Sequence, residues 1–147
     1  MTTIACDGRV MAADTQISGD YIDHHEMRKV VVLNSGAICG MAGYTRVVAP
    51  FIEWLNNGCP PSEKPKTEDD KDFTALLLKK QGDVTELYCY ESPEFVPFQV
   101  GWPAAIGSGA QFAMGAMFMG ADAVKAVMAA IRYDVHSGGS VVCERLK

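Results

Sequence analysis

The sequence lacks the features that mark membrane and secreted proteins. It has no uninterrupted apolar stretch of 18 residues, and no basic patch followed by an apolar segment at its start. Its five cysteines form no C-x-x-C pair, and their number is odd. Most of them lie in apolar runs such as 37–40 and 87–90, where a reduced cysteine acts as a small hydrophobic residue. We therefore expect a cytoplasmic protein with reduced thiols.

An excess of positive charge is also missing. The 13 Lys and Arg residues are outnumbered by 18 Asp and Glu residues, which gives a formal net charge of -5 and a pI near 5.1. Because a polyanion is attracted by clustered Lys and Arg, this balance argues against a nucleic-acid or membrane partner.

The chain is long enough for one substantial core. It has 147 residues, of which 48% are hydrophobic and 21% charged. This length is too short to divide comfortably into two domains, so residues 1–147 are interpreted as a single globular domain.

The first residues predict a β-hairpin. Two apolar segments, 3–6 and 9–13, flank Asp7-Gly8, a dipeptide that favours a two-residue turn between antiparallel strands. With these two residues as the loop, Ile4 faces Met11 and Thr2 faces Ala13. The hairpin thus brings Asp14 beside Thr2.

The rest of the chain predicts more strands than helices. A helix is expected over 44–55, with Pro50 as an unfavourable residue inside it, and 60–71 reads as a solvated loop. Met-rich, small-residue segments predict two further helices, whose methionines we assign to core packing. This order favours an α+β fold of two stacked antiparallel sheets with helices on both outer faces. The remaining elements are expected at 29–33, 37–43, 73–79, 84–90, 95–100 and 140–143 for strands, and at 110–119 and 121–133 for helices.

Six short motifs occur in a characteristic order over residues 2–143. They are Thr2-Thr3-Ile4, Ala12-Ala13-Asp14, Arg28-Lys29-Val30, Met41-Ala42-Gly43, Gly107-Ser108-Gly109 and Asp134-x-x-Ser137-Gly138-Gly139. Because these motifs occur in the same order there, the chain resembles proteasome β subunits and their bacterial ATP-dependent relatives. The resemblance implies a four-layer αββα sandwich, the N-terminal-nucleophile hydrolase fold. It also implies a threonine endopeptidase that cleaves unfolded polypeptides inside a homo-oligomeric chamber, with an ATPase unfoldase as a possible partner.

Thr2 is suited to act as a nucleophile if it becomes the first residue. An N-terminal threonine carries a hydroxyl and a free amine, and the amine can take the hydroxyl proton directly or through a water. The reference pKa of such an amine is about 7.7 to 8.0, close to working pH, whereas that of lysine is about 10.4. Met1 must be removed first, because an amide nitrogen cannot accept the proton.

The resemblance implies roles for further residues. Lys29 lowers the pKa of the Thr2 hydroxyl, Asp14 holds the Lys29 ammonium, and the N–H of Gly43 stabilises the oxyanion. Ser108, Asp134 and Ser137 match the polar cluster that orients the terminal amine. Substrate-contacting positions are matched by Ser18, Met27 and Met41, and the two methionines predict a mild preference for apolar or bulky side chains.

Neither a metal nor another cofactor is expected. His24 and His25 are adjacent and so point in different directions, His136 lies inside the Asp134–Ser137 motif, and no carboxylate pattern has metal-ligand spacing.

Two rival functions remain open at this point. One is a non-catalytic, self-assembling scaffold or shell subunit that keeps Met1. The other is an amidase for small amides, because the same fold supports many such reactions.

Overall fold

The chain forms an α+β structure with two main antiparallel sheets and three α-helices. The computed structural model describes residues 2–18 and 22–147, and for Ser18 and 22–26 it describes the backbone alone. The strands are β1 Thr3–Cys6, β2 Val10–Asp14, β3 Gln16–Ser18, β4 Ile22–Glu26, β5 Val30–Val32, β6 Ile38–Gly43, β7 Phe73–Gln81, β8 Val84–Glu91, β9 Phe98–Val100, β10 Ala104–Gly107 and β11 Val141–Arg145. The α-helices are α1 Val48–Asn56, α2 Ala110–Phe118 and α3 Ala123–Tyr133, and short 3-10 turns occur at Thr45–Val47 and Pro61–Glu63.

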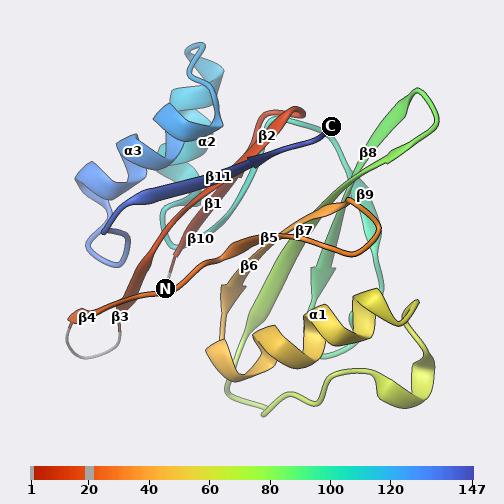
Figure 1. Ribbon diagram of the computed structural model, residues 1–147. Coiled ribbons are helices and arrows are strands. Elements are labelled where there is room, and N and C mark those ends of the chain that lie inside the picture. The colour runs from red at the N-terminus through yellow and green to blue at the C-terminus, as the bar shows by residue number, and fades with distance from the viewer. Residues whose placement is uncertain (1, 19–21) are drawn as a thin grey trace.

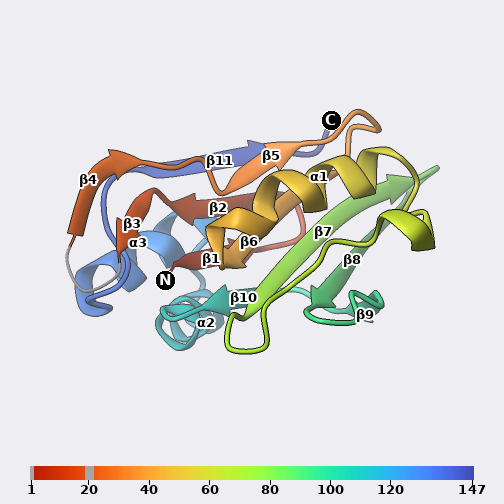
Figure 2. The same cartoon turned by 90° about the horizontal axis from the view of Figure 1, so that it is seen from below.

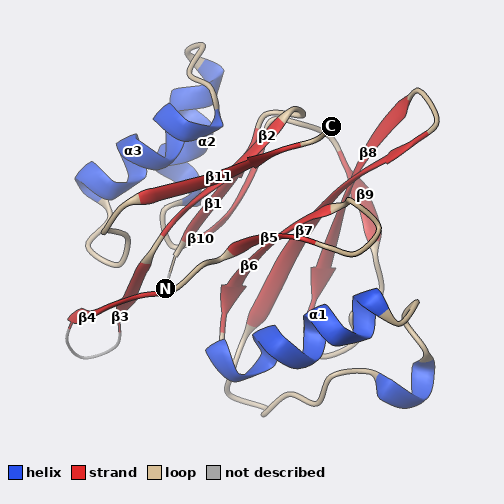
Figure 3. Cartoon of the chain, viewed as in Figure 1, coloured by secondary structure: helices blue, strands red, loops and turns tan. Residues whose placement is uncertain are grey.

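The strands are grouped into two sheets and one ribbon (Figure 3). The first sheet has the order β10-β1-β2-β11, and the second has the order β5-β6-β7-β8-β9. Every pair of neighbours is antiparallel. The ribbon β3-β4 joins the first sheet to the second along the chain.

Figures 1 and 2 show the two sheets with α1 on one side and the α2–α3 pair on the other. Three apolar clusters hold these layers together. One fills the space between the sheets and contains Ile4 and Met11 with Ile38 and Leu87. The second lies between the second sheet and α1, around Phe51. The third lies between the first sheet and the α2–α3 pair. This sequence of layers is compatible with the expected sandwich.

The two sheets approach each other closely at Gly40 in β6. A methyl group built on Gly40 would lie 2.5 Å from Cγ2 of Ile4 and 2.6 Å from Sδ of Met11. Any larger residue would force these buried side chains or the sheets themselves to move. Gly40 pairs with Val30 of β5, so this close approach occurs next to Lys29.

The register of the first hairpin differs from the predicted one by two residues. Ile4 pairs with Ala13 and Cys6 with Met11, so Asp7 faces Val10 and the two-residue loop is Gly8-Arg9, one residue later than predicted. The cause is Asp7, whose Oδ1 accepts hydrogen bonds from the backbone N–H groups of Arg9 and Val10 at 3.0 and 2.9 Å. A side chain that binds the backbone two and three residues ahead favours Asp7 as the residue that precedes the two-residue loop, not as part of that loop.

Most other predicted elements are confirmed, with shifts of a few residues at their ends. The turns at 34–36 and 82–83 connect hairpins as expected. Pro50 falls in the first turn of α1, where its missing N–H would have no helical partner anyway, so it does not disturb the helix. The strand predicted at 95–100 is shorter in the structure, where β9 covers only Phe98–Val100, and the unpredicted β10 follows it before α2.

The described residues contain no helix with the length and apolarity needed to cross a lipid bilayer.

Candidate active site

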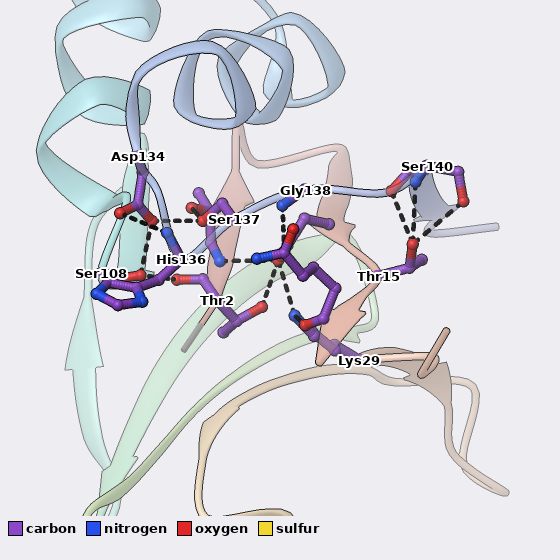
Figure 4. Close-up of polar contacts among 12 residues, drawn as sticks. Thr2, Thr15, Lys29, Ser108, Asp134, His136, Ser137, Gly138 and Ser140 are labelled. Atoms are coloured by element: carbon purple, nitrogen blue, oxygen red, sulfur yellow. Dashed lines mark hydrogen bonds and ion pairs between the residues drawn. The ribbon is translucent and has the colours of Figure 1, made fainter. Parts of the chain in front are cut away.

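Thr2, Asp14 and Lys29 meet at one end of the space between the two sheets (Figure 4). Thr2 immediately precedes β1, Asp14 ends the neighbouring strand β2, and Lys29 precedes β5 of the other sheet. The Thr2 hydroxyl donates a short hydrogen bond to Oδ1 of Asp14. Lys29 Nζ lies 3.0 Å from the same oxygen. The hydroxyl and the ammonium therefore share one carboxylate oxygen.

Asp14 is fully buried, and both of its oxygens have partners. Besides Thr2 and Lys29, the N–H of Thr3 donates to Oδ1 at 3.0 Å. The N–H of Gly138 donates to Oδ2 at 3.0 Å. Backbone donors and one cation together compensate a charge that burial would otherwise make very costly. The carboxylate thereby fixes the start of β1 relative to the loop after α3.

Lys29 is a buried cation with two acceptors. Its Nζ binds Asp14 and also donates to the backbone carbonyl of Gln16 at 2.6 Å. Burial lowers the pKa of the Lys29 ammonium below its ordinary value of 10.5, and the nearby Asp14 charge opposes this shift only in part. A buried ammonium beside a hydroxyl favours the deprotonated form of that hydroxyl.

A second polar group surrounds the backbone of Thr2 and the side chain of Thr3. Ser108 Oγ donates to Oδ2 of Asp134 at 2.7 Å and lies 3.3 Å from the Thr2 carbonyl oxygen. Ser137 Oγ donates to the same Asp134 oxygen at 2.6 Å and lies 2.7 Å from Thr3 Oγ1. Because Ser137 has one proton, which it gives to Asp134, Thr3 is the donor in the last contact.

Hydrogen bonds set the charge state of Asp134. Burial acts to raise the pKa of this carboxyl group. The two serine hydroxyls and the N–H of His136 outweigh that effect, because they stabilise the charged form, and the net pKa lies below the ordinary 3.8. At neutral pH Asp134 is therefore an ionised acceptor that orients Ser108 and Ser137.

The hydroxyl of Thr2 adjoins a pocket. The residues that line it include Thr2, Lys29 and Gly43, together with the two methionines Met27 and Met41. A wider cleft continues from Thr2 and Gly43 to Gly107 and the segment 70–74. The structure thus brings five of the predicted site residues to one cavity. The side chains of Met27 and Met41 make one wall of this cavity apolar.

Two glycines beside Thr2 are needed for close backbone approach. Gly43 has φ = +120°, and a methyl group built on it would lie 2.2 Å from the carbonyl oxygen of Asp72. Gly107 has φ = +94°, and a methyl group there would lie 2.0 Å from the carbonyl oxygen of Thr2. Packing alone therefore demands glycine at both positions, whatever role the Gly43 N–H has in chemistry.

Sequence reasoning missed several members of the cluster. Thr3 connects Asp14, through its N–H, with Ser137, through its hydroxyl. The Gln16 carbonyl accepts a hydrogen bond from Lys29, and the Gly138 N–H donates one to Asp14. Backbone donors and acceptors carry no residue-type signal, whereas the consecutive threonines at the chain start could have suggested a role for Thr3.

Some predicted residues lie outside what the structure describes or away from this cluster. The side chains of Ser18, His24 and His25 lie outside the described residues. His136 is exposed, and its backbone N–H binds Asp134. No group of three potential metal ligands occurs within residues 2–18 and 22–147.

Comparison with protein-family models and with curated proteins finds no match to this chain. The geometry of the site therefore carries the functional argument.

Proposed function

We propose that the chain is an N-terminal threonine peptidase with the αββα N-terminal-nucleophile hydrolase fold, in which Thr2 attacks the peptide bond after Met1 is removed. The observation that carries this proposal is the shared oxygen of Asp14, which receives both the Thr2 hydroxyl and the Lys29 ammonium at the edge of a pocket. A threonine with only a structural role needs neither a buried lysine beside it nor an adjoining cavity.

The reaction begins with proton transfer within Thr2. The free α-amine takes the Oγ1 proton, directly or through a water, as Oγ1 forms a bond to the substrate carbonyl carbon. The carbonyl electrons move onto oxygen, and the N–H of Gly43, at the pocket wall, is the proposed donor to that oxyanion. Collapse of the intermediate breaks the carbon–nitrogen bond, and the ammonium returns its proton to the leaving amine. Water then hydrolyses the Thr2 ester with the same amine as base.

The surrounding residues act on charge and position. Lys29 stabilises the developing alkoxide of Thr2, while Asp14 keeps the ammonium in place. Asp134 holds Ser108 beside the Thr2 carbonyl and Ser137 beside Thr3, which fixes the residue whose amine is the base. Peptide side chains that enter the pocket meet Met27 and Met41, which favour apolar or bulky groups.

We further propose an unfolded polypeptide as substrate, a cytoplasmic homo-oligomer as the working form and an ATPase unfoldase as a possible partner. A peptidase whose cleft is open to solvent would also cleave exposed segments of folded proteins. A chamber formed by several copies admits only unfolded chains to the site.

The decisive experiment compares Thr2→Ala with Thr2→Ser in protein whose intact mass lacks one methionine. Thr2→Ala should lose all hydrolysis of casein and of short peptides while keeping its circular dichroism spectrum. Thr2→Ser keeps a hydroxyl and should retain measurable turnover. An electrophilic peptide inhibitor should add to the wild type at Thr2 and not to Thr2→Ala. Full activity in Thr2→Ala would refute the proposal.

The same samples separate the rival functions. Retained Met1 in protein isolated from its native cell, without turnover, indicates a scaffold or shell subunit. Hydrolysis of small amides without cleavage of casein indicates an amidase. The structure offers no specific contact that favours either over the peptidase.

A further inference from the structure

A basic pocket lies away from the Thr2 site, where the chain's last residues meet the turns of two hairpins. Four cations line it: Arg9 from the β1–β2 turn, Lys80 from β7, and Arg145 and Lys147 from the end of the chain. The other lining residues are Gly8, Thr85 and Leu146, so none of the described residues at this pocket is acidic. Such a concentration of positive charge is unexpected in a chain of net charge -5.

Backbone pairing holds these cations together. Arg145 pairs with Val10 at the end of the β11–β2 ladder, and the N–H of Leu146 donates to the carbonyl of Arg9 at 3.3 Å. Leu146 also packs against the cluster between the sheets. Lys80 pairs with Thr85 near the β7–β8 turn. The backbone positions of Arg9, Lys80 and Arg145 are therefore set by the folded sheets, and Lys147 directly follows the anchored Leu146.

The nearby carboxylates are engaged elsewhere. Burial acts to raise the pKa of Asp7, but the backbone N–H groups of the turn and of Ala123 in α3, and less strongly the charge of Arg145, lower it. Glu144 forms an ion pair with Arg28. In the part of the chain that the structure describes, the ion pairs use Arg28, Lys29 and Lys71 and none of the four pocket cations.

From this arrangement we infer that the pocket of Arg9, Lys80, Arg145 and Lys147 is a binding site for a small multivalent oxyanion. Guanidinium and ammonium groups that line one pocket and form no ion pair with the described residues can form charge-assisted hydrogen bonds to such a ligand. A chain that ends at Lys147 adds one carboxylate here, and the charge of the pocket stays positive. The site is too compact for the extended basic stripe that tracks a nucleic acid, so it does not conflict with the acidic character of the whole chain.

The binding test uses inorganic tripolyphosphate as the probe and Trp102 as the reporter. The Trp102 ring lies against Gly8, where a methyl group would be 2.6 Å from it, and is 45% exposed, whereas the other tryptophan, Trp54, is buried. Titration at constant ionic strength should give a saturable change in tryptophan fluorescence, lost in Trp102→Phe. Calorimetry should still detect binding by Trp102→Phe, and the affinity should fall as NaCl increases.

Two double variants with the same change in net charge test where the anion binds. Arg9→Gln with Lys80→Gln should weaken binding about tenfold, since two charge-assisted contacts are lost. Lys125→Gln with Arg132→Gln removes one lysine and one arginine from α3 and should leave the affinity unchanged. Circular dichroism and thermal unfolding verify that both variants are folded. The inference would be overturned by an equal loss of affinity in both double variants, by no loss of affinity in either, or by the absence of saturable binding to the wild type.

Discussion

At the scale of single residues, the charge of Asp14 is the most demanding feature of the molecule. This carboxylate is fully buried, and Lys29 is the cation that balances it. Three further donors, from Thr2, Thr3 and Gly138, satisfy its remaining hydrogen-bonding capacity but carry no charge. The ion pair is therefore required to keep a charge that the proposed chemistry uses.

Removal of the Lys29 ammonium should destabilise the fold as well as abolish peptide hydrolysis. We expect Lys29→Ala to lower the free energy of unfolding at pH 7 by about 3–5 kcal/mol, because it leaves a buried charge without its partner. Urea unfolding followed by circular dichroism measures the change. Lys125→Ala, an exposed lysine of α3, is the control and should change stability by less than about 0.5 kcal/mol. Equal stability of the two variants would show that Lys29 does not balance Asp14.

Asp134 should contribute to the loss of stability in acid. Its pKa in the folded protein lies below 3.8, its ordinary value, so the unfolded chain binds a proton more readily. The contribution is fully present above pH 3.8 and is lost as the pH falls through the lower pKa of the folded state. In urea unfolding between pH 5 and about pH 2.5, the free energy of unfolding should therefore fall less steeply with decreasing pH for Asp134→Asn than for the wild type. Parallel curves for the two proteins would contradict this assignment.

The proximity of Thr2 and Asp14 was predictable from the hairpin, although its detailed register was not. The predicted two-residue turn placed Thr2 opposite Ala13, whereas the observed pairing puts Ala13 opposite Ile4. Both registers bring Asp14 to the start of the chain because they differ by two residues, which preserves the faces of the strands. The Gln16 carbonyl that binds Lys29 was not predictable, since every residue carries that group.

At the scale of elements, the glycines before and within α2 have opposite roles. A methyl group on Gly109 would lie 2.0 Å from Thr3 Oγ1, at the point where the helix start adjoins the site. Gly115 is exposed within α2, and nothing lies within 4 Å of a methyl group there. One glycine is needed for close packing, and the other only weakens the helix.

The two corresponding alanine variants should move stability in opposite directions. Gly115→Ala should raise the free energy of unfolding by about 0.5–1 kcal/mol through higher helix propensity. Gly109→Ala should lower it by about 1–3 kcal/mol, because the added methyl group overlaps Thr3. Chemical unfolding of both variants beside the wild type measures the difference. Destabilisation by Gly115→Ala would show that this face of α2 is covered.

Turn chemistry made most elements predictable. Asn34-Ser35-Gly36 and Gln81-Gly82-Asp83 mark hairpins, and the structure confirms both. The first turn was predicted one residue too early, because an aspartate can precede a tight turn and bind its backbone N–H groups as well as lie within it. Pro50 was expected to be unfavourable because the helix was predicted to begin at residue 44. The helix α1 begins at Val48, so Pro50 lies in its first turn, where proline is tolerated.

At the scale of the whole molecule, the α2–α3 pair exposes a large amount of apolar surface. Phe118 and Met119 at the end of α2 are 86% and 81% exposed, and Phe112 contacts Tyr133 of α3 with a ring separation of 6.0 Å. The assignment of the helix methionines to core packing is therefore wrong for Met119, as it is for Met114 and Met128, and holds for the buried Met117. Large exposed apolar side chains that gather on one face are characteristic of regions that associate with other proteins. This surface supports the proposed homo-oligomer without defining the number of copies.

A charge placed on this surface should reduce assembly. We expect wild-type protein to exceed the 15.9 kDa of one chain in light scattering after size exclusion, and Phe118→Glu to shift the particle toward that mass. Val84→Glu introduces the same charge at an exposed valine on the β7–β8 hairpin and serves as the control. A monomeric wild type, or equal dissociation by both variants, would exclude this helical surface as the basis of assembly.

The glycine between the two sheets has a consequence for how such a site can change over evolution. Gly40 is not among the residues that line the pocket at Thr2, yet its missing side chain sets the thickness of the interior beside the strand that follows Lys29. Ile4 and Met11 set this thickness from the strands next to Thr2 and Asp14. The spacing of Thr2 and Lys29, the proposed nucleophile and its ammonium, thus depends on the bulk of buried groups that have no role in the proposed chemistry. Substitutions in that apolar layer can alter reactivity while every polar residue stays the same.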